Sequence, residues 1–84
     1  MVSPSLRDLS WTLSHNLMMY RHQHNLSQKR FARKCDIGEE SYRLVESGQN
    51  VPRIETLLKI SAMMGIKWTD LFVDQYRHGV IGEE

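Results

Sequence analysis

The segment from Ser27 to Gly48 constrains the fold most, because it contains two short helical patterns separated by only three residues. The break is Cys35-Asp36-Ile37. Asp36 lies where the chain must turn sharply, and aspartate tolerates a positive φ better than most residues do. Gly48 follows the second pattern, where a glycine commonly ends a helix. The segment therefore predicts two short helices joined by a tight turn.

The residues before this segment predict one long first helix, over residues 3–24. Ser5 and Asp8 fit a capping box near its start, and Asn25 can take the left-handed conformation that ends it. One stripe with helical spacing is expected to face the core: Leu6, Leu9, Leu13, Leu17 and Tyr20. A second stripe comprises Trp11, His15, Met18 and His22. The second stripe is either part of a broad core face or a surface for a partner or a second copy of the chain.

The two helices around the turn each have an inward and an outward face. On the first, with Ser27 as its N-cap, the inward residues are Phe31, Ala32 and Cys35, and the cations Lys29, Arg30, Arg33 and Lys34 are left on the other face. On the second, over residues 39–47, Ile37, Tyr42 and Val45 are expected to point inward. This leaves Glu39, Glu40, Arg43, Leu44 and Ser47 facing out. The cations either form a solvated surface or neutralise phosphates. Pairing of Arg30 or Arg33 with Glu39 or Glu40 is a further alternative.

The rest of the chain predicts two more helices and a tail. The fourth helix spans residues 54–64 and ends at Gly65. A short fifth helix covers about residues 69–73, anchored by Ile66, Trp68, Leu71 and Phe72. Residues 74–84 form a tail whose two glycines disfavour a continuous helix, and a strand is expected only if this tail forms one. The prediction is an all-α fold of five helices in a single domain, residues 1–84.

Size and composition restrict the function classes. A chain of 84 residues has room for one core. Its net charge of +1 does not by itself indicate a polyanionic partner, so the clustering of cations is more informative than their number. A single cysteine excludes an internal disulfide and suits a reducing compartment. With no leader and no long apolar run, we expect a cytoplasmic protein without a membrane segment.

Catalytic and metal sites have little support in the sequence. The four histidines and Cys35 show no pair spacing typical of zinc ligands. Cys35 falls at an apolar turn position, which favours a buried, unreactive thiol over a redox sensor. No Gly-x-Ser-x-Gly element is present, and the chain is short for a deep pocket. We therefore expect no enzyme activity, no cofactor and no metal.

An ordered set of residues resembles the Cro/CI-type, or XRE-type, helix-turn-helix domain of phage and bacterial repressors. The set is Leu26-Ser27-Gln28, Phe31-Ala32, Ile37, Glu46-Ser47-Gly48, Pro52, Glu55-Thr56-Leu57-Leu58-Lys59-Ile60 and Gly65-Ile66. The resemblance covers residues 13–72 and leaves an N-terminal helix extension, residues 3–12, and the tail. It implies a lambda-repressor-like fold, dimeric operator binding and a third helix that reads the DNA.

The resemblance also implies roles for individual residues. Gln28, at the start of the second helix, corresponds to a phosphate contact, and Lys29 lies beside it. The outward residues of the recognition helix correspond to Glu39, Glu40, Ser41, Arg43 and Leu44. Further phosphate contacts correspond to Gln49, Asn50 and Arg53 in the loop before the fourth helix. Arg21 and Glu46 correspond to a structural ion pair.

Two carboxylates at the start of the recognition helix depart from the family pattern. Glu39 and Glu40 could accept hydrogen bonds from cytosine N4, stabilise the helix N-terminus, or mark a surface that does not bind DNA. Arg43 is the strongest candidate for a base contact, because a guanidinium can bridge guanine O6 and N7; a phosphate contact is the alternative. Leu44 either touches a thymine methyl group or covers the edge of the core.

Two functions follow from these features. The first is a dimeric, sequence-specific transcriptional regulator, a repressor, that reads an inverted-repeat operator in double-stranded DNA. The second is a protein-interaction module, an antitoxin or anti-regulator, that binds a toxin or regulator through the extended first helix. The residues expected in a dimer or partner surface are Trp11, His15, Met18, Trp68, Phe72 and Tyr76.

Overall fold

The computed structural model describes residues 5–49 and 51–74, and in these ranges every regular element is a helix. The elements are α1 (Leu6–Gln23), α2 (Gln28–Cys35), α3 (Glu39–Glu46), α4 (Ile54–Met64) and the 3-10 helix η1 (Trp68–Phe72). The all-α fold class is confirmed. Tyr76 with the rest of the tail, the loop residue Asn50 and the expected first turn at residues 3–4 lie outside the described residues.

The expectation of five α-helices is wrong, because the fifth segment is a 3-10 helix. Its five residues are too few to repay the cost of starting an α-helix. The Asp70 amide donates to the Lys67 carbonyl over 2.9 Å, and the Val73 amide donates to the Asp70 carbonyl over 3.1 Å. These three-residue spacings define the tighter helix. The domain therefore consists of four α-helices and one short 3-10 turn.

The helix ends follow local capping chemistry. Ser5 and Asp8 form the predicted capping box, with both hydrogen bonds 3.1 Å long. The Ser27 hydroxyl accepts from the Arg30 amide over 3.1 Å at the start of α2. Asn25 and Asp36 adopt positive φ values of 53° and 61°, as predicted for both. Local sequence therefore fixes where α1 and α2 end and how sharply the chain turns after each.

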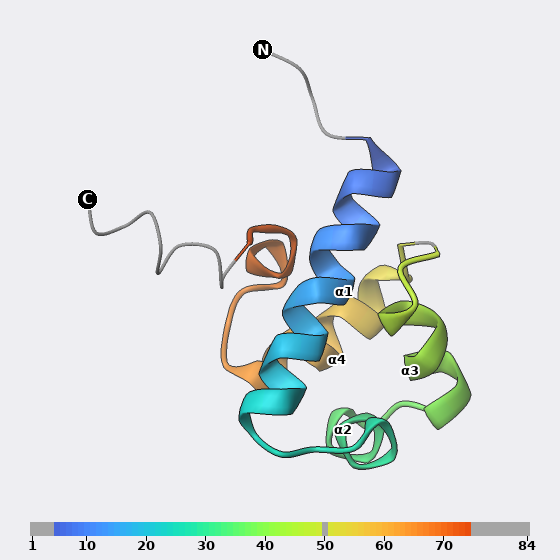
Figure 1. The fold of residues 1–84 in the computed structure, drawn as a ribbon, viewed down its shortest axis with the longest axis vertical. Helices are drawn as coiled ribbons and strands as arrows, with labels where there is room; N and C mark the ends of the chain where they lie inside the picture. Colours follow the sequence, from blue (N-terminus) through green and yellow to red (C-terminus); the bar gives the residue numbers. More distant parts are fainter. Residues whose placement is uncertain (1–4, 50, 75–84) are drawn as a thin grey trace, which may run out of the picture.

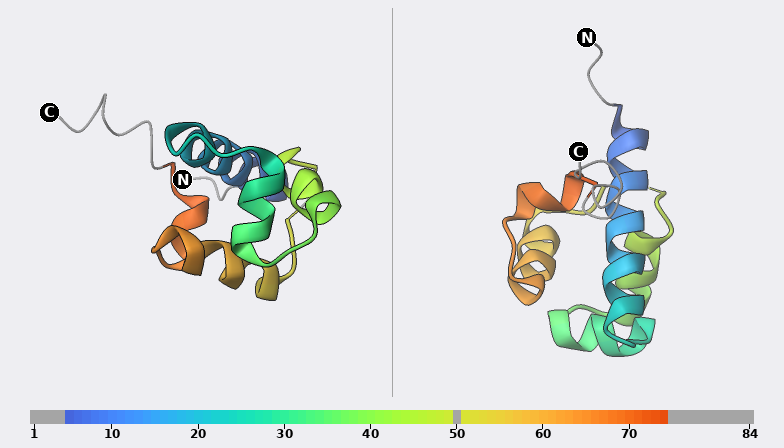
Figure 2. Two further views of the ribbon diagram at one scale, coloured as in Figure 1. Left: turned by 90° about the horizontal axis from the view of Figure 1, so that it is seen from below. Right: turned by 60° about the vertical axis from the view of Figure 1, so that its left-hand side comes forward.

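The helices enclose one core. α1 runs along the long axis of the molecule with α2 at its C-terminal end, and α3 and η1 lie on opposite sides of it (Figures 1 and 2). α4 packs against α2 and η1. The buried apolar side chains come from all five elements: Leu13, Leu17, Phe31, Ala32, Cys35, Tyr42, Val45, Leu57, Ile60 and Leu71. The rings of Phe31 and Tyr42 stack with centroids 4.8 Å apart, which joins α2 to α3 through the core.

The first turns of α1 extend past the core. Leu13 and Leu17 are fully buried, but Leu6 is 73% exposed, so the prediction that Leu6 faces the core is wrong. It is exposed because the helix projects beyond its neighbours at this end (Figure 1). The second stripe is also exposed along its length, with Trp11 at 60%. The stripe is therefore an outer surface and not part of a broad core face.

A buried carboxylate links α1, α2 and α3. The two oxygens of Glu46 accept four hydrogen bonds. Arg21 Nε and Nη2 donate over 2.8 and 3.0 Å, Tyr42 Oη over 2.5 Å and Gln28 Nε2 over 2.6 Å. Arg21 Nη1 also donates to the Leu26 carbonyl over 3.0 Å. The network of Arg21, Gln28, Tyr42 and Glu46 contains the ion pair that the resemblance implied, and it leaves no polar side-chain atom unsatisfied among the described buried residues.

The electrostatics of this network favour a charged Glu46. Burial alone would raise the pKa of Glu46, but hydrogen bonds from Arg21, Tyr42 and Gln28 outweigh burial and lower the pKa. The hydrogen bond to Glu46 raises the pKa of Arg21. Burial, followed by the bond to Glu46, raises the pKa of Tyr42, so its hydroxyl keeps the proton that it donates. The pair is therefore charged in the folded protein at neutral pH.

A hydroxyl and a glycine fix the end of α3 to α1. The Ser14 hydroxyl donates to the Glu46 carbonyl, one of the last carbonyls of α3. Gly48 follows with a φ of 75°, and a Cβ there would lie 3.5 Å from Ser14 Cβ. A residue with a side chain would therefore be strained at this position. α3 is held to α1 both by its buried side chains and at its C-terminal end.

Glu46→Gln should destabilise the fold by about 3–5 kcal/mol at neutral pH, because it removes one partner of a buried ion pair. Folding lowers the pKa of Glu46, so its ionised form stabilises the fold above the unfolded pKa of about 4.3. This contribution is lost as pH falls through the folded-state pKa. Urea unfolding as a function of pH measures both effects.

Glu55→Gln is the matched control, because Glu55 is exposed in the first turn of α4. Glu46→Gln should show a flatter loss of stability on acidification than the wild type, whereas Glu55→Gln should follow the wild type closely. Equal pH dependence in all three proteins would show that Glu46 is not the group that links stability to pH.

Candidate nucleic-acid interface

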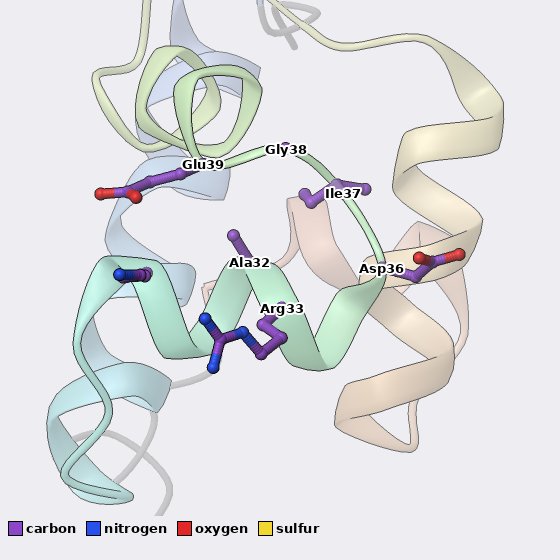
Figure 3. Close-up of a pocket in the computed structure, with 7 residues that line it drawn as sticks. Ala32, Arg33, Asp36, Ile37, Gly38 and Glu39 are labelled. Carbon is purple, nitrogen blue, oxygen red and sulfur yellow. The ribbon is translucent and has the colours of Figure 1, made fainter.

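α2 and α3 form a compact unit around the turn at residues 36–38. The Ile37 amide donates to the Ala32 carbonyl over 3.0 Å, which closes the end of α2 around the left-handed Asp36. An open pocket of about 420 Å³ lies between the two helices. Its lining residues are Lys29, Ala32, Arg33, Asp36, Ile37, Gly38 and Glu39 (Figure 3). The arrangement is a helix-turn-helix, with the start of α3 at the surface.

α3 has one buried face and one exposed face. Tyr42, Val45 and Glu46 are buried, as the spacing predicted for the first two. The exposed side chains include four of the five recognition-helix candidates: Glu40, Ser41, Arg43 and Leu44. Glu39 is half-buried. The structure thus brings the predicted base readers together on one outward surface of a helix whose other side is fixed in the core.

Glu39 and Arg43 form an ion pair on this exposed surface. Arg43 Nη2 lies 2.6 Å from Glu39 Oε2, and the two side chains are 55% and 36% exposed. Glu39 and Arg43 are four residues apart in the sequence, and this spacing could have predicted the pair. The alternative given by the sequence pairs Arg30 or Arg33 of α2 with Glu39 or Glu40. In the described part of the chain, Glu39 pairs within its own helix instead.

The side chain of Gln28 lies at the boundary between the buried Glu46 network and the protein surface. Its side chain is half-buried, and one of its amide hydrogens points to Glu46 Oε1 over 2.6 Å. A primary amide has two N–H donors, so a second donor remains for another acceptor. The family resemblance did not show this bond to Glu46. The residue implied as a phosphate contact is therefore also part of the buried network.

The cations of α2 divide into two exposed pairs along the helix. Lys29 and Arg33 line the pocket beside α3, and the Arg33 guanidinium is seen at its edge in Figure 3. Arg30 and Lys34 line a different hollow with Tyr20, His24, Leu26 and Met63. Lys29 and Arg33 therefore lie closest to the candidate recognition surface, and Arg30 and Lys34 border the end of α1.

The loop before α4 adds a cation to the same face. Arg53, the N-cap residue of α4, is exposed and shares a hollow with Ser41 and Leu44 of α3. Gln49 is also exposed but lines a different hollow, beside the first turns of α1. Of the loop candidates, the structure thus joins Arg53 to the outward face of α3 and places Gln49 apart from it.

The expected partner surface consists of two separate regions. Trp11 borders a hollow with Leu6, Gln49 and Val51, on the side of the loop that follows α3. Trp68 and Phe72 lie on η1, with their rings edge to face and centroids 6.5 Å apart. Asn16 fixes η1 to α1 by donating to the Leu71 and Val73 carbonyls, both over 2.8 Å. His15 and Met18 are exposed on α1.

Residues 5–49 and 51–74 contain no group of three histidine, cysteine or acidic side chains that could hold a metal ion. None of their helices is long and apolar enough to cross a membrane. Cys35 is buried in the core, and burial raises the pKa of its thiol to about 12. The thiol therefore stays protonated at neutral pH, which suits a packing role.

Comparisons with known proteins agree with this geometry. The model of the helix-turn-helix family matches residues 17–71. An uncharacterised HTH-type transcriptional regulator of Methanocaldococcus jannaschii, MJ0272, is 30% identical over 61 residues, which are 73% of this chain and 92% of that protein. The crystal structure of a hypothetical transcription factor from Neisseria, NHTF, has the same fold. It has a TM-score of 0.77 at 24% identity and covers 94% of this chain and 90% of its own.

The family match begins inside α1 and ends inside η1, so it includes the whole of α2, α3 and α4. It also includes both members of the Arg21–Glu46 pair and every described residue of the outward face of α3. The elements that build the candidate interface are therefore the elements that the family shares, and the chain belongs to the XRE-type helix-turn-helix family of DNA-binding transcription regulators.

Proposed function

We propose that this protein is a sequence-specific transcriptional repressor that binds an inverted-repeat operator as a homodimer. The observation that carries the proposal is the way α3 is held. Its inner face is fixed by Tyr42, Val45 and the Glu46 network, while Ser41, Arg43 and Leu44 remain exposed. A rigid helix with an exposed polar face is the element that enters a DNA major groove.

Phosphate contacts are available on both sides of α3. Gln28 has a second N–H donor at the start of α2 that bonds to none of the described residues, with Lys29 next to it. On the other side of α3, Arg53 lies beside Ser41 and Leu44 of the outward face. Contacts to phosphates on either side of a groove set the register of the helix, and base contacts then supply sequence selectivity. Arg43 has the donor geometry for guanine and Leu44 suits a thymine methyl group.

A homodimer would present two copies of α3 to one face of the duplex. Half-site centres about 34 Å apart, one helical turn, suit such a dimer. The dimer surface that we favour is at η1, because Trp68 on η1 and Val73 directly after it are exposed apolar residues, and α1 holds this segment in place. A dimer bound over a promoter would block access to that DNA, which is the basis of the repressor assignment.

Arg43→Ala should weaken binding to the best operator by about 1–3 kcal/mol and relax selectivity at one base pair. The operator would be selected from random duplexes by the purified protein, and affinities measured by fluorescence anisotropy at several salt concentrations. Lys29→Ala is the comparison variant: it should weaken binding to all sequences and reduce the salt dependence. Failure of the wild type to enrich any sequence at micromolar concentration would refute the proposal.

Trp68→Glu should convert the dimer to a monomer, because it places a charge in an apolar contact. Sedimentation velocity would measure the oligomeric state. Trp11→Glu is the matched control, since Trp11 is also exposed but lies on the other apolar region. Dimerisation that survives Trp68→Glu and is lost on Trp11→Glu would move the dimer surface to α1.

A second candidate function is a protein-interaction module, an antitoxin or anti-regulator. The observation that favours it is the projecting start of α1, where Leu6 and Trp11 are exposed beside a hollow. On this hypothesis a stoichiometric partner, such as a toxin or regulator produced with the chain, should co-purify with the wild type and with Arg43→Ala. It should be lost with Trp11→Ala. Retention of that partner by Trp11→Ala would exclude α1 as its binding surface.

A further inference from the structure

We propose that Glu39 is a positioning residue that holds Arg43 for guanine recognition and thereby sets sequence selectivity at one G·C base pair. This inference rests on the proposed DNA-binding function and assigns a role to the acidic start of α3. It predicts that the carboxylate acts through the guanidinium and is not itself the base reader.

The geometry of the pair directs Arg43 toward the DNA-proximal end of α3. Side chains on an α-helix lean toward its N-terminus, so residues four apart meet on one face. Arg43 Nη2 reaches Glu39 Oε2 at 2.6 Å, which places the guanidinium beside the first residue of the helix. Residues near the N-terminus of a recognition helix are those that reach base edges. The ion pair therefore holds the cation where a base would be read.

The donor inventory leaves Arg43 able to bind a base while paired. A guanidinium has five N–H donors on three nitrogens, and the contact with Glu39 uses Nη2. Guanine needs two parallel donors for its O6 and N7 atoms. The guanidinium can therefore hold the carboxylate on one side and the base edge on another. A long side chain that is already ordered also loses less rotamer freedom on binding.

The surroundings of Glu39 explain why a carboxylate is tolerated at a DNA-facing position. Figure 3 shows its side chain extending from the start of α3 on the side that faces the N-terminal part of α2. Lys29 and Arg33 line the same pocket as Glu39, and Arg43 completes a cationic surrounding on its own helix. Glu40 is exposed and forms no ion pair among the described residues. The two carboxylates therefore differ: Glu39 is engaged with the candidate reader, and Glu40 is not.

Exposure to water makes the pair weak in the free protein, and DNA would strengthen it. Both side chains are at least one-third exposed, so solvent screens their attraction. A closed protein–DNA interface has less solvent between the charges, and the same contact becomes stronger there.

The test measures the affinity of four proteins for the selected operator, for each single-base variant of its half-site and for random DNA. The proteins are the wild type, Glu39→Ala, Glu39→Gln and Glu40→Ala. Glu39→Ala should lose about fivefold or more of the preference for guanine at the base pair that Arg43→Ala identifies. Glu39→Gln should stay within about twofold of the wild type, because its amide oxygen accepts the same hydrogen bond.

Glu40→Ala is the charge-matched control. All three variants remove one negative charge, so all should bind random DNA more tightly than the wild type to a similar degree. Only Glu39→Ala should lose the guanine preference. In an Arg43→Ala background, adding Glu39→Ala should leave that preference unchanged, because a positioning residue acts only through its partner.

Three results would overturn the inference. Glu39→Ala could behave as Glu40→Ala does, which would leave only a charge effect. Glu39→Gln could lose the preference as fully as Glu39→Ala, which would show that an acceptor for the Arg43 guanidinium at residue 39 is not what sets the preference. Glu39→Ala could instead change the preference at a base pair that Arg43→Ala does not affect, which would make Glu39 itself a base reader. Each differs from failure of the proposed function, in which the wild type selects no operator.

Discussion

The buried Glu46 carboxylate is the interaction on which the arrangement of the first three helices depends. It accepts hydrogen bonds from α1 through Arg21, from α2 through Gln28 and from its own helix through Tyr42. A carboxylate removed from water is costly unless its oxygens are fully paired, and here two oxygens receive four donors. If any one of these donors moved away, part of the cost of burying the Glu46 carboxylate would be uncompensated. The network therefore favours one relative placement of the three helices more strongly than apolar packing alone would.

Much of the fold was predictable because its signals are local. Ser5 with Asp8, Ser27, Asp36 and Gly48 fixed the helix ends through capping and left-handed geometry, and the structure places them as predicted. The failures have physical causes that a local pattern does not contain. Leu6 has the right spacing for the core, but its helix extends past the other elements. The last segment has helical spacing but only five residues, too few for an α-helix.

The candidate interface was only partly predictable for a similar reason. The outward face of α3 followed from its spacing. Several nearby cations could pair with the Glu39 carboxylate. The clustered cations of α2 suggested a partner on that helix, whereas the structure pairs Glu39 with Arg43 of its own helix. Four-residue spacing within one helix was the better guide, because backbone geometry places those side chains together before any tertiary contact forms. With Glu39 paired to Arg43, the acidic start of α3 is compatible with DNA binding.

The amide of Gln28 connects the folding of this domain with its surface chemistry. One N–H is fixed on Glu46 inside the protein, and the other is available at the start of α2. An acceptor that binds the outer hydrogen of Gln28 therefore binds an amide that the folded interior has already oriented. The binding energy and the folding energy are then linked quantities. A substitution of Gln28 would change the binding energy and the folding energy together. Evolution could therefore adjust the surface contact at residue 28 only by also changing the stability of the domain.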